Sequence, residues 1–244
     1  MQHLLRNKII TSIFILAILL PSIGQAQLRN EINSPDHDDQ KFHFGISLGI
    51  NRSHYGILHS PRFLAFDSVN VIESVNSTGI NLAGLVNMRL SNHLDVRTYP
   101  LNLVFTEKVF QYTLKTPDLS RKENSISTKK VSGISLVLPF HLKFSSDRIN
   151  NFKVFVIAGG RLDYDLAANA GKKNNDDALT LQKLDYAAEA GIGFHFYFPV
   201  FVLTPELKVT YGLRNVLSKE SGYKYSNTID QINARAITFS LTVE

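Results

Sequence analysis

The chain has 244 residues and contains no cysteine, which excludes a disulfide framework and a thiol nucleophile. Lys and Arg outnumber Asp and Glu by 26 to 21, so the formal net charge at pH 7 is +5. Nucleic-acid-binding proteins share such a basic balance, but the N-terminus predicts export from the cytoplasm. We therefore expect no nucleic acid among the partners.

Residues 1–26 are predicted to be a secretory signal peptide. Arg6 and Lys8 supply a positive start, and an apolar run follows over residues 9–20. Small residues then lead to Ala26, so cleavage is expected directly after it. The apolar run is shorter than the ~20 residues that a bilayer-spanning helix needs. An uncleaved N-terminal anchor is the alternative.

Residues 27–41 are interpreted as a periplasmic N-terminal linker. They are polar and acidic, with Pro35 followed by the run Asp36–Asp39. Adjacent Asp and His side chains can bind a metal, but a short charged run without a rigid scaffold is typical of a solvated tail. We predict no metal site in this segment.

A period of two in hydrophobicity begins at Phe42 and recurs along the rest of the chain. Phe42, Phe44 and Ile46 alternate with His43 and Gly45, so the predicted strand has one apolar face and one face of small polar residues. In a membrane barrel the apolar face meets lipid and the polar face lines the lumen. Seven further segments repeat the pattern: residues 80–90, 94–99, 134–144, 153–166, 184–198, 203–213 and 236–243.

The connections between these eight segments alternate between long and short. Outer-membrane barrels have short periplasmic turns and long outer loops, whereas a soluble sandwich has no reason to alternate in this way. The sequence therefore predicts an all-β fold, an eight-stranded antiparallel transmembrane β-barrel over residues 42–244. A soluble sandwich or lipocalin-like barrel is the alternative. The expected connections are residues 54–77, 91–92, 115–130, 146–151, 170–180, 199–200 and 214–233.

Aromatic residues of the apolar face are expected to form two girdles, because amphipathic rings favour the two membrane interfaces. The residues near the short turns are phenylalanines: Phe42, Phe44, Phe144, Phe152, Phe196, Phe198 and Phe201. The residues near the long loops are tyrosines: Tyr164, Tyr186 and Tyr211. A purely packed core would not sort these residues by strand end.

The predicted lumen face carries charges of both signs. The interior of an eight-stranded barrel is only wide enough for side chains to fill it, and an unpaired charge there is costly. We therefore predict a salt-bridged plug, with a proton or ion path, or a catalytic pair formed by Glu189 and Glu206, as alternatives. The predicted network is Arg89, Asp95, Arg97, Lys143, Arg161, Asp163, Glu189, Glu206 and Lys208.

Three prolines, Pro100, Pro139 and Pro205, interrupt the predicted strands. Proline cannot donate to a β-ladder, and a closed barrel has no free edge to accommodate it. Each is therefore expected to remove a ladder hydrogen bond or to lie at a bulge. A wall weakened for a partner is the alternative.

The second long connection is predicted to be a basic loop, formed by Arg121, Lys122, Lys129 and Lys130. It would lie near the phosphates of outer-leaflet lipopolysaccharide, and an ordinary solvated loop is the alternative. His54 and His59 are expected to be solvent-exposed, because no nucleophile, phosphate-binding or metal motif accompanies them. We predict no catalytic residue, cofactor or metal.

Several stretches resemble the PorT family of outer-membrane proteins. They are FHFGISLGIN (42–51), LVLPFHLKF (136–144), RINNF (148–152), GIGFHFYFP (191–199) and LTPELKVTYGL (203–213). The resemblance implies a non-enzymatic assembly or accessory component of the type IX protein secretion system, which in gliding bacteria also supports motility. It implies a bacterial outer-membrane location and other secretion-system proteins as partners, beside outer-membrane lipid and lipopolysaccharide. A stand-alone surface barrel that binds lipopolysaccharide or host surfaces through the basic loop is the alternative, and a barrel enzyme is another.

Overall fold

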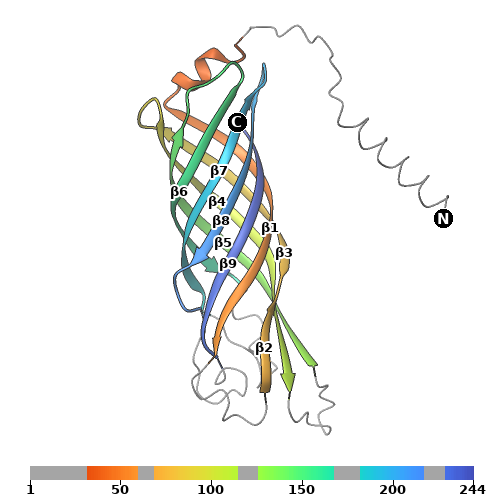
Figure 1. Cartoon of the computed structure of the whole chain (residues 1–244). Coiled ribbons are helices and arrows are strands. Elements are labelled where there is room, and N and C mark those ends of the chain that lie inside the picture. Colours follow the sequence, from red (N-terminus) through yellow and green to blue (C-terminus); the bar gives the residue numbers. More distant parts are fainter. Residues whose placement is uncertain (1–31, 60–68, 115–125, 168–181, 217–228) are drawn as a thin grey trace, which may run out of the picture. The chain divides into compact units, whose positions relative to one another are not determined.

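The computed structural model describes residues 32–59, 69–114, 126–167, 182–216 and 229–244 (Figure 1). This part consists of one short 3-10 helix followed by strands, and none of its helices is long and apolar enough to cross a membrane. The predicted signal peptide lies outside the described residues. The elements are η1 (Pro35–Asp39), β1 (Phe42–His59), β2 (Val69–Val75), β3 (Ser77–Arg89), β4 (Leu94–Leu114), β5 (Ile126–Ser145), β6 (Phe152–Asp165), β7 (Leu184–Tyr197), β8 (Val202–Gly212) and β9 (Ile229–Val243).

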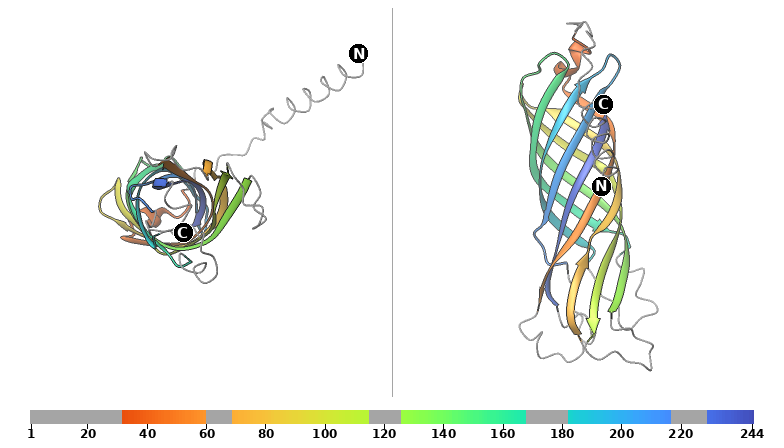
Figure 2. Two further views of the ribbon diagram at one scale, coloured as in Figure 1. Left: turned by 90° about the horizontal axis from the view of Figure 1, so that it is seen from below. Right: turned by 45° about the vertical axis from the view of Figure 1, so that its right-hand side comes forward.

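The strands form one closed antiparallel barrel. Each strand from β3 to β9 pairs with its neighbour along the chain, β1 pairs with both β3 and β9, and the β4–β5 ladder completes the ring. Strands β2 and β3 both pair with β4 and are separated by Asn76 alone, so together they fill one position in the wall. The barrel therefore has eight strand positions, which confirms the predicted fold class. Figure 2 shows the ring end-on.

The outer face of the barrel is apolar over most of its height. Phe44, Ile46 and Leu101 expose between 67% and 72% of their surface, although burying such side chains in an apolar medium stabilises by roughly 1.5–3 kcal/mol each. Their neighbours along the strands face inward and are polar, for example Ser47 and Thr242, both of which are buried. This inverted pattern is expected where the surrounding solvent is lipid.

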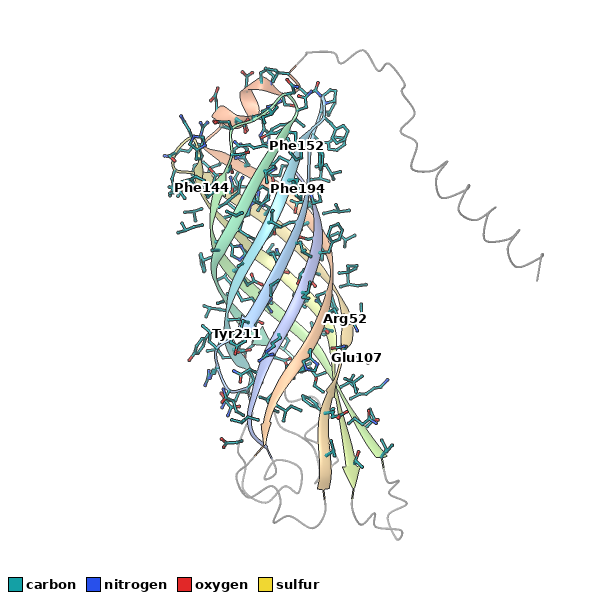
Figure 3. The ribbon with its side chains drawn as sticks, viewed as in Figure 1. Arg52, Glu107, Phe144, Phe152, Phe194 and Tyr211 are labelled. Atoms are coloured by element: carbon teal, nitrogen blue, oxygen red, sulfur yellow. The ribbon has the colours of Figure 1, made fainter. Side chains whose placement is uncertain are left out.

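The predicted girdle residues that Figure 3 labels lie at the expected ends of the barrel. Phe144 and Phe152 lie at the end with the short turns, and Tyr211 lies toward the other end. Helix η1 and the C-terminus lie at the short-turn end as well (Figure 1). The short-turn end is therefore the periplasmic one, because short turns face the periplasm in outer-membrane barrels.

Several strands are longer than predicted, so parts of three expected loops are in fact strand. Strand β1 continues to His59, β2 occupies residues 69–75, β5 begins at Ile126 and β9 begins at Ile229. The prediction was wrong there because it followed the apolar/polar alternation, which ends where the outer face leaves lipid. The backbone ladder does not depend on that alternation and continues beyond it.

Strand β4 carries a β-bulge at Tyr99–Pro100. Between the pairs Val86↔Thr98 and Gly84↔Leu101, β3 advances by two residues while β4 advances by three. The β4–β5 ladder gains the same single residue on β4, between Thr98 and Asn102. The bulge shifts the alternation, so lumen residues have odd numbers before it and even numbers after it.

The prolines follow the expected pattern. Pro100 lies in the bulge, and Pro139 faces the same irregularity from β5. Pro205 lies where two register pairs are missing from the β7–β8 ladder, without a shift in register. The strands tolerate these residues at points where the ladder is already interrupted.

Candidate functional site

The lumen is filled by side chains at three levels, which we name from the short-turn end outward. The periplasmic mouth contains η1 and Lys153, the inner lumen surrounds Arg97, and the outer lumen surrounds Arg161. Each level is held by ion pairs between residues of different secondary-structure elements.

At the periplasmic mouth, η1 is fastened to the barrel through Asp38. Its carboxylate forms ion pairs with Arg148 at 3.5 Å and Lys153 at 3.3 Å, and it accepts a hydrogen bond from the Tyr197 hydroxyl at 2.8 Å. Burial alone would raise the pKa of Asp38, but this hydrogen bond and the two cations outweigh it and hold the pKa below its ordinary value. The carboxylate is therefore ionised at neutral pH.

Further contacts hold the same segment in place. The Arg89 guanidinium donates to the Asp38 carbonyl oxygen and forms an ion pair with Asp39 at 3.3 Å. The His37 ring lies on the His43 ring, with centroids 4.4 Å apart. Residues 35–39 are thus an ordered cap, which differs from the solvated linker that the sequence predicts. Helix η1 is only five residues long: Pro35 begins it, and Gln40, in an extended conformation, ends it.

In the inner lumen, Arg97 links two carboxylates across the barrel. Its side chain is 0% exposed and forms ion pairs with Glu206 at 3.0 Å and Glu244 at 3.1 Å. Glu206 also binds Lys208 at 2.9 Å. A charge with no access to water needs such compensation, because the desolvation of an isolated ion costs several kcal/mol.

Aromatic rings fill the remaining space around Arg97. The Phe155 ring centroid lies 4.9 Å from the Arg97 guanidinium carbon and 5.2 Å from Lys143 Nζ. Gly193, opposite Phe155 in the β6–β7 ladder, leaves room for this ring: a Cβ there would lie 2.2 Å from Phe155 Cζ. The inner lumen is therefore packed without space for a water column.

The outer lumen repeats the ion-pair chemistry with looser packing. Glu189 accepts from Arg161 at 3.0 Å and contacts His141 at 2.8 Å, while Arg161 also pairs with Asp163 and Lys108 with Asp165. A cavity of about 70 Å³ lies beside them, which is large enough and polar enough to hold a few water molecules. Its lining includes Ser53, Tyr55, Lys108, Arg161, Asp163 and Asp185.

The structure brings most of the predicted lumen charges together. The residues in inter-strand or neighbouring ion pairs within the lumen are Asp95, Arg97, Lys143, Arg161, Asp163, Glu189, Glu206 and Lys208. Arg89 instead lies at the periplasmic mouth, paired with the cap. Sequence reasoning missed Lys108, Asp165, His141 and Glu244. Lys108 follows the bulge, so a strict alternation in β4 assigns it to the wrong face, whereas His141 and Asp165 obey the alternation and carried a readable signal.

The other candidates lie apart from this network. His54 faces outward and is exposed, and Lys130 is exposed and lies 4.0 Å from Glu107. Arg121 and Lys122 lie outside the described residues, as do the side chains of His59 and Lys129. Glu189 and Glu206 are each bound to cations, and His141 is fully buried, so a substrate has no access to them. No metal-binding group of three or more His, Asp or Glu residues occurs within the described part of the chain.

Comparison with known proteins identifies the barrel type. The family described as outer membrane protein beta-barrel domain matches residues 25–218. No curated protein matches the chain. Among solved structures, OprG of Pseudomonas aeruginosa is 13% identical, covering 82% of this chain and 93% of OprG with a TM-score of 0.42. Neisserial surface protein A is 10% identical, covering 84% and 99% with a TM-score of 0.40. The Yersinia pestis attachment invasion locus protein Ail, in complex with a heparin analogue, is 10% identical, covering 84% and 99% with a TM-score of 0.38.

Proposed function

We propose, from the premise that this chain belongs to the outer membrane protein β-barrel domain family, that it is a non-conducting barrel acting through protein contacts. Its specific role in this proposal is that of an assembly or accessory component of the type IX protein secretion system. The chain is located in the bacterial outer membrane. The observation that carries the proposal is the filled inner lumen, where Arg97 and Glu206 are both 0% exposed. A protein cargo cannot pass such a lumen, so any role in secretion has to be exerted from the surface.

A second feature supports protein contacts on the outer side. Strand β2 and the outer ends of β4 and β5 form a small sheet, here called the outer extension, beyond the level of Tyr211 (Figures 1 and 3). It exposes Val71, Val75 and Ile126, at 37%, 38% and 52%. Apolar side chains in this position are outside the hydrocarbon layer, so burying them against another protein would be favourable.

The choice of secretion system rests on the PorT resemblance of residues 42–51, 136–144, 148–152, 191–199 and 203–213. A function in gliding motility would follow from the same role, because motility in these bacteria depends on the exported proteins.

Deleting the gene and measuring secreted cargo tests the proposal. We expect the deletion to abolish export and the wild-type gene to restore it. A triple variant, Val71→Ser/Val75→Ser/Ile126→Ser, should insert normally but restore export poorly, whereas the matched exposed polar variant Glu73→Gln should restore it fully. Normal secretion in the deletion strain would contradict the type IX role.

A stand-alone surface barrel is the second candidate, favoured by the exposure of Lys130 on the outer extension. Neutralising Arg121, Lys122, Lys129 and Lys130 together distinguishes the two. Under our proposal the quadruple variant still supports secretion. The surface role would be favoured by two results together: the quadruple variant loses binding to lipopolysaccharide or host surfaces, and the deletion strain secretes normally.

The filled lumen also predicts the electrical behaviour of the barrel. Purified wild-type protein in a planar bilayer should show no stable porin-like conductance, because an eight-stranded barrel packed with side chains leaves no aqueous channel. A steady large conductance in single-channel recordings would overturn the non-conducting scaffold.

A further inference from the structure

We infer that the barrel carries a binding site for a phosphate group of outer-leaflet lipopolysaccharide, formed by Arg52, His54 and Arg235. The site lies on the outside of the wall, at the outer end of the lipid-facing band. It goes beyond the proposed role in secretion and involves neither the lumen nor the predicted basic loop.

The β-ladder places the three side chains on one face. Arg52 and His54 are two residues apart on β1, and His54 is the direct register partner of Arg235 on β9. Alternate residues of a strand and directly opposed residues of an antiparallel pair share a face. All three are exposed, so they form one cluster on adjacent strands, pointing away from the lumen.

The cluster begins where the apolar wall ends. Along β1, the outward residues that precede Arg52 are apolar, with Leu48 and Ile50 exposed by 59% and 58%. On β9, the outward residue at the level of Arg52 is its register partner Ile237, which is apolar, and the next outward residue toward the outer end is Arg235. Figure 3 shows Arg52 toward the same end of the barrel as Tyr211, whose ring belongs to the outer girdle. This is the depth at which the head groups of the outer leaflet replace hydrocarbon.

The cluster has no counter-ion among the described residues. Neither Arg52, His54 nor Arg235 forms an ion pair there, in contrast to Arg97 or Arg161 in the lumen. The exposed carboxylates described on the neighbouring strands of that side are Glu73 of β2, the strand that lies beside β1 beyond the end of β3, and Glu107 of β4, which lies 4.0 Å from Lys130. Neither forms an ion pair with the cluster. The local charge is therefore positive and open to a ligand.

Arg235 is held in position for this role. Its guanidinium carbon lies 5.2 Å from the centroid of the Tyr211 ring. On the other side it approaches Gly56, where a Cβ would lie 3.5 Å from the guanidinium carbon. These two contacts restrict the position of the guanidinium, whose planar set of N–H donors suits bidentate binding of phosphate oxygens.

The surroundings select a lipid phosphate over a soluble anion. The site lies on a convex wall rather than in a cleft, so it cannot enclose a small soluble anion. A lipid phosphate can be held there because its acyl chains lie against the apolar residues below. Lipopolysaccharide supplies phosphates at this depth in the outer leaflet. Each Arg or Lys close to an anionic membrane surface contributes about fivefold in affinity.

The test uses the folded barrel in detergent micelles and measures lipid A retained per barrel by native mass spectrometry. The probes are bisphosphorylated lipid A, lipid A stripped of phosphate, and inorganic phosphate. Arg52→Gln and Arg235→Gln should each lower retention of bisphosphorylated lipid A about fivefold, and the double variant about 25-fold. Lys130→Gln removes an exposed cation that already has a carboxylate partner, so retention should stay within about twofold of wild type. Gel mobility before and after heating verifies that each variant is folded.

Three results would overturn the inference. One is equal retention of both lipid A forms by the wild type, because binding would then depend on acyl chains alone. The second is loss of retention in Lys130→Gln with no loss in the double variant, which would place the site at Lys130 on strand β5 of the outer extension. Competition by millimolar inorganic phosphate would also contradict it, since a soluble anion would then be the ligand. Phosphate-free lipid A should be retained equally by wild type and double variant.

Discussion

The inner and outer lumen use the same kind of interaction in different surroundings. The Arg97–Glu206 pair has no exposed surface, and the Phe155 ring packs against Arg97. Around Lys108 and Asp165 the paired side chains are 10% and 6% exposed and border the cavity. We therefore expect the contribution of an ion pair to stability to depend on whether water can solvate the partner left behind, and we expect the inner half to seal the barrel.

The largest effect is expected from opening the inner lumen. Arg97→Ala leaves Glu206 and Glu244 buried without their shared cation, and stranding a fully buried charge costs roughly 3–5 kcal/mol. Urea unfolding in detergent, or the temperature at which the folded band disappears on a gel, measures the loss. A change below about 1 kcal/mol would mean that the inner lumen hydrates freely, and the comparison would fail.

A smaller effect is expected from the matching change in the outer lumen. Lys108→Ala strands Asp165, but water in the adjoining cavity can solvate this carboxylate. The expected loss is about 1–3 kcal/mol, the range for an unsatisfied buried polar group. The same unfolding assay measures it, and a loss equal to that of Arg97→Ala would show that the two halves do not differ.

Overfilling the inner lumen sharpens the comparison from the opposite direction. Gly193→Ala places a Cβ 2.2 Å from Phe155 Cζ, so the ring has to move, and overpacking of this kind typically costs about 1–3 kcal/mol. Gly84→Ala is the control, because a Cβ at Gly84 meets nothing within 4 Å. Equal unfolding midpoints for the two variants would contradict the tight packing.

The smallest effect is expected at the periplasmic mouth, and it depends on pH. The pKa of Asp38 is lower in the folded barrel than its ordinary value of 3.8. A carboxyl with a lowered folded-state pKa stabilises the cap fully above the ordinary value, and this stabilisation is lost as pH falls through the folded-state pKa. The protection factor of residues 35–39, which is the intrinsic exchange rate at each pH divided by the observed rate, should therefore be high at neutral pH and fall below about pH 4.

The matching variant removes the charge at constant pH. Asp38→Asn should accelerate exchange of the same residues at pH 7. It should change the global free energy of unfolding by less than about 1 kcal/mol, because the ion pairs of Asp38 are partly exposed. Unchanged exchange in this variant would mean that the aromatic contacts of His37, not the charge, hold the cap.

The barrel itself was predictable from the sequence because lipid imposes a simple rule on each strand. Residues such as Ile46 and Leu207 face out and Ser47 and Glu206 face in, and this alternation can be read without a structure. The alternation of connection lengths then fixes the orientation. The ends of the strands were less predictable, since β1 beyond Arg52 is held by its ladder rather than by an amphipathic pattern.

The lumen charges were predictable as a set but not as pairs. Arg97 and Glu206 are separated by 109 residues, and which carboxylate meets which cation depends on strand tilt and shear. The cap at the periplasmic mouth gave no periodic signal, because Asp38 is recognised by Arg148, Lys153 and Tyr197 only after the barrel has closed. The cluster of Arg52, His54 and Arg235 likewise requires the β1–β9 register, which joins the two ends of the barrel chain.

The extra residue at Tyr99–Pro100 has a consequence for how this strand can change during evolution. It switches which residues of β4 face the lumen. Arg97 and Tyr99 face inward before the bulge, at odd-numbered positions, and Asn102 and Val104 face inward after it, at even-numbered positions. Exchanging Pro100 for another residue preserves both patterns. If the residue is deleted, the two patterns can no longer both face the lumen. One half of β4 must then turn its inward polar residues toward lipid, Arg97 in the first half or Asn102 in the second. The position is therefore tolerant of substitution and intolerant of deletion: the residue type at Pro100 can change during evolution, but the number of residues in β4 has to stay the same.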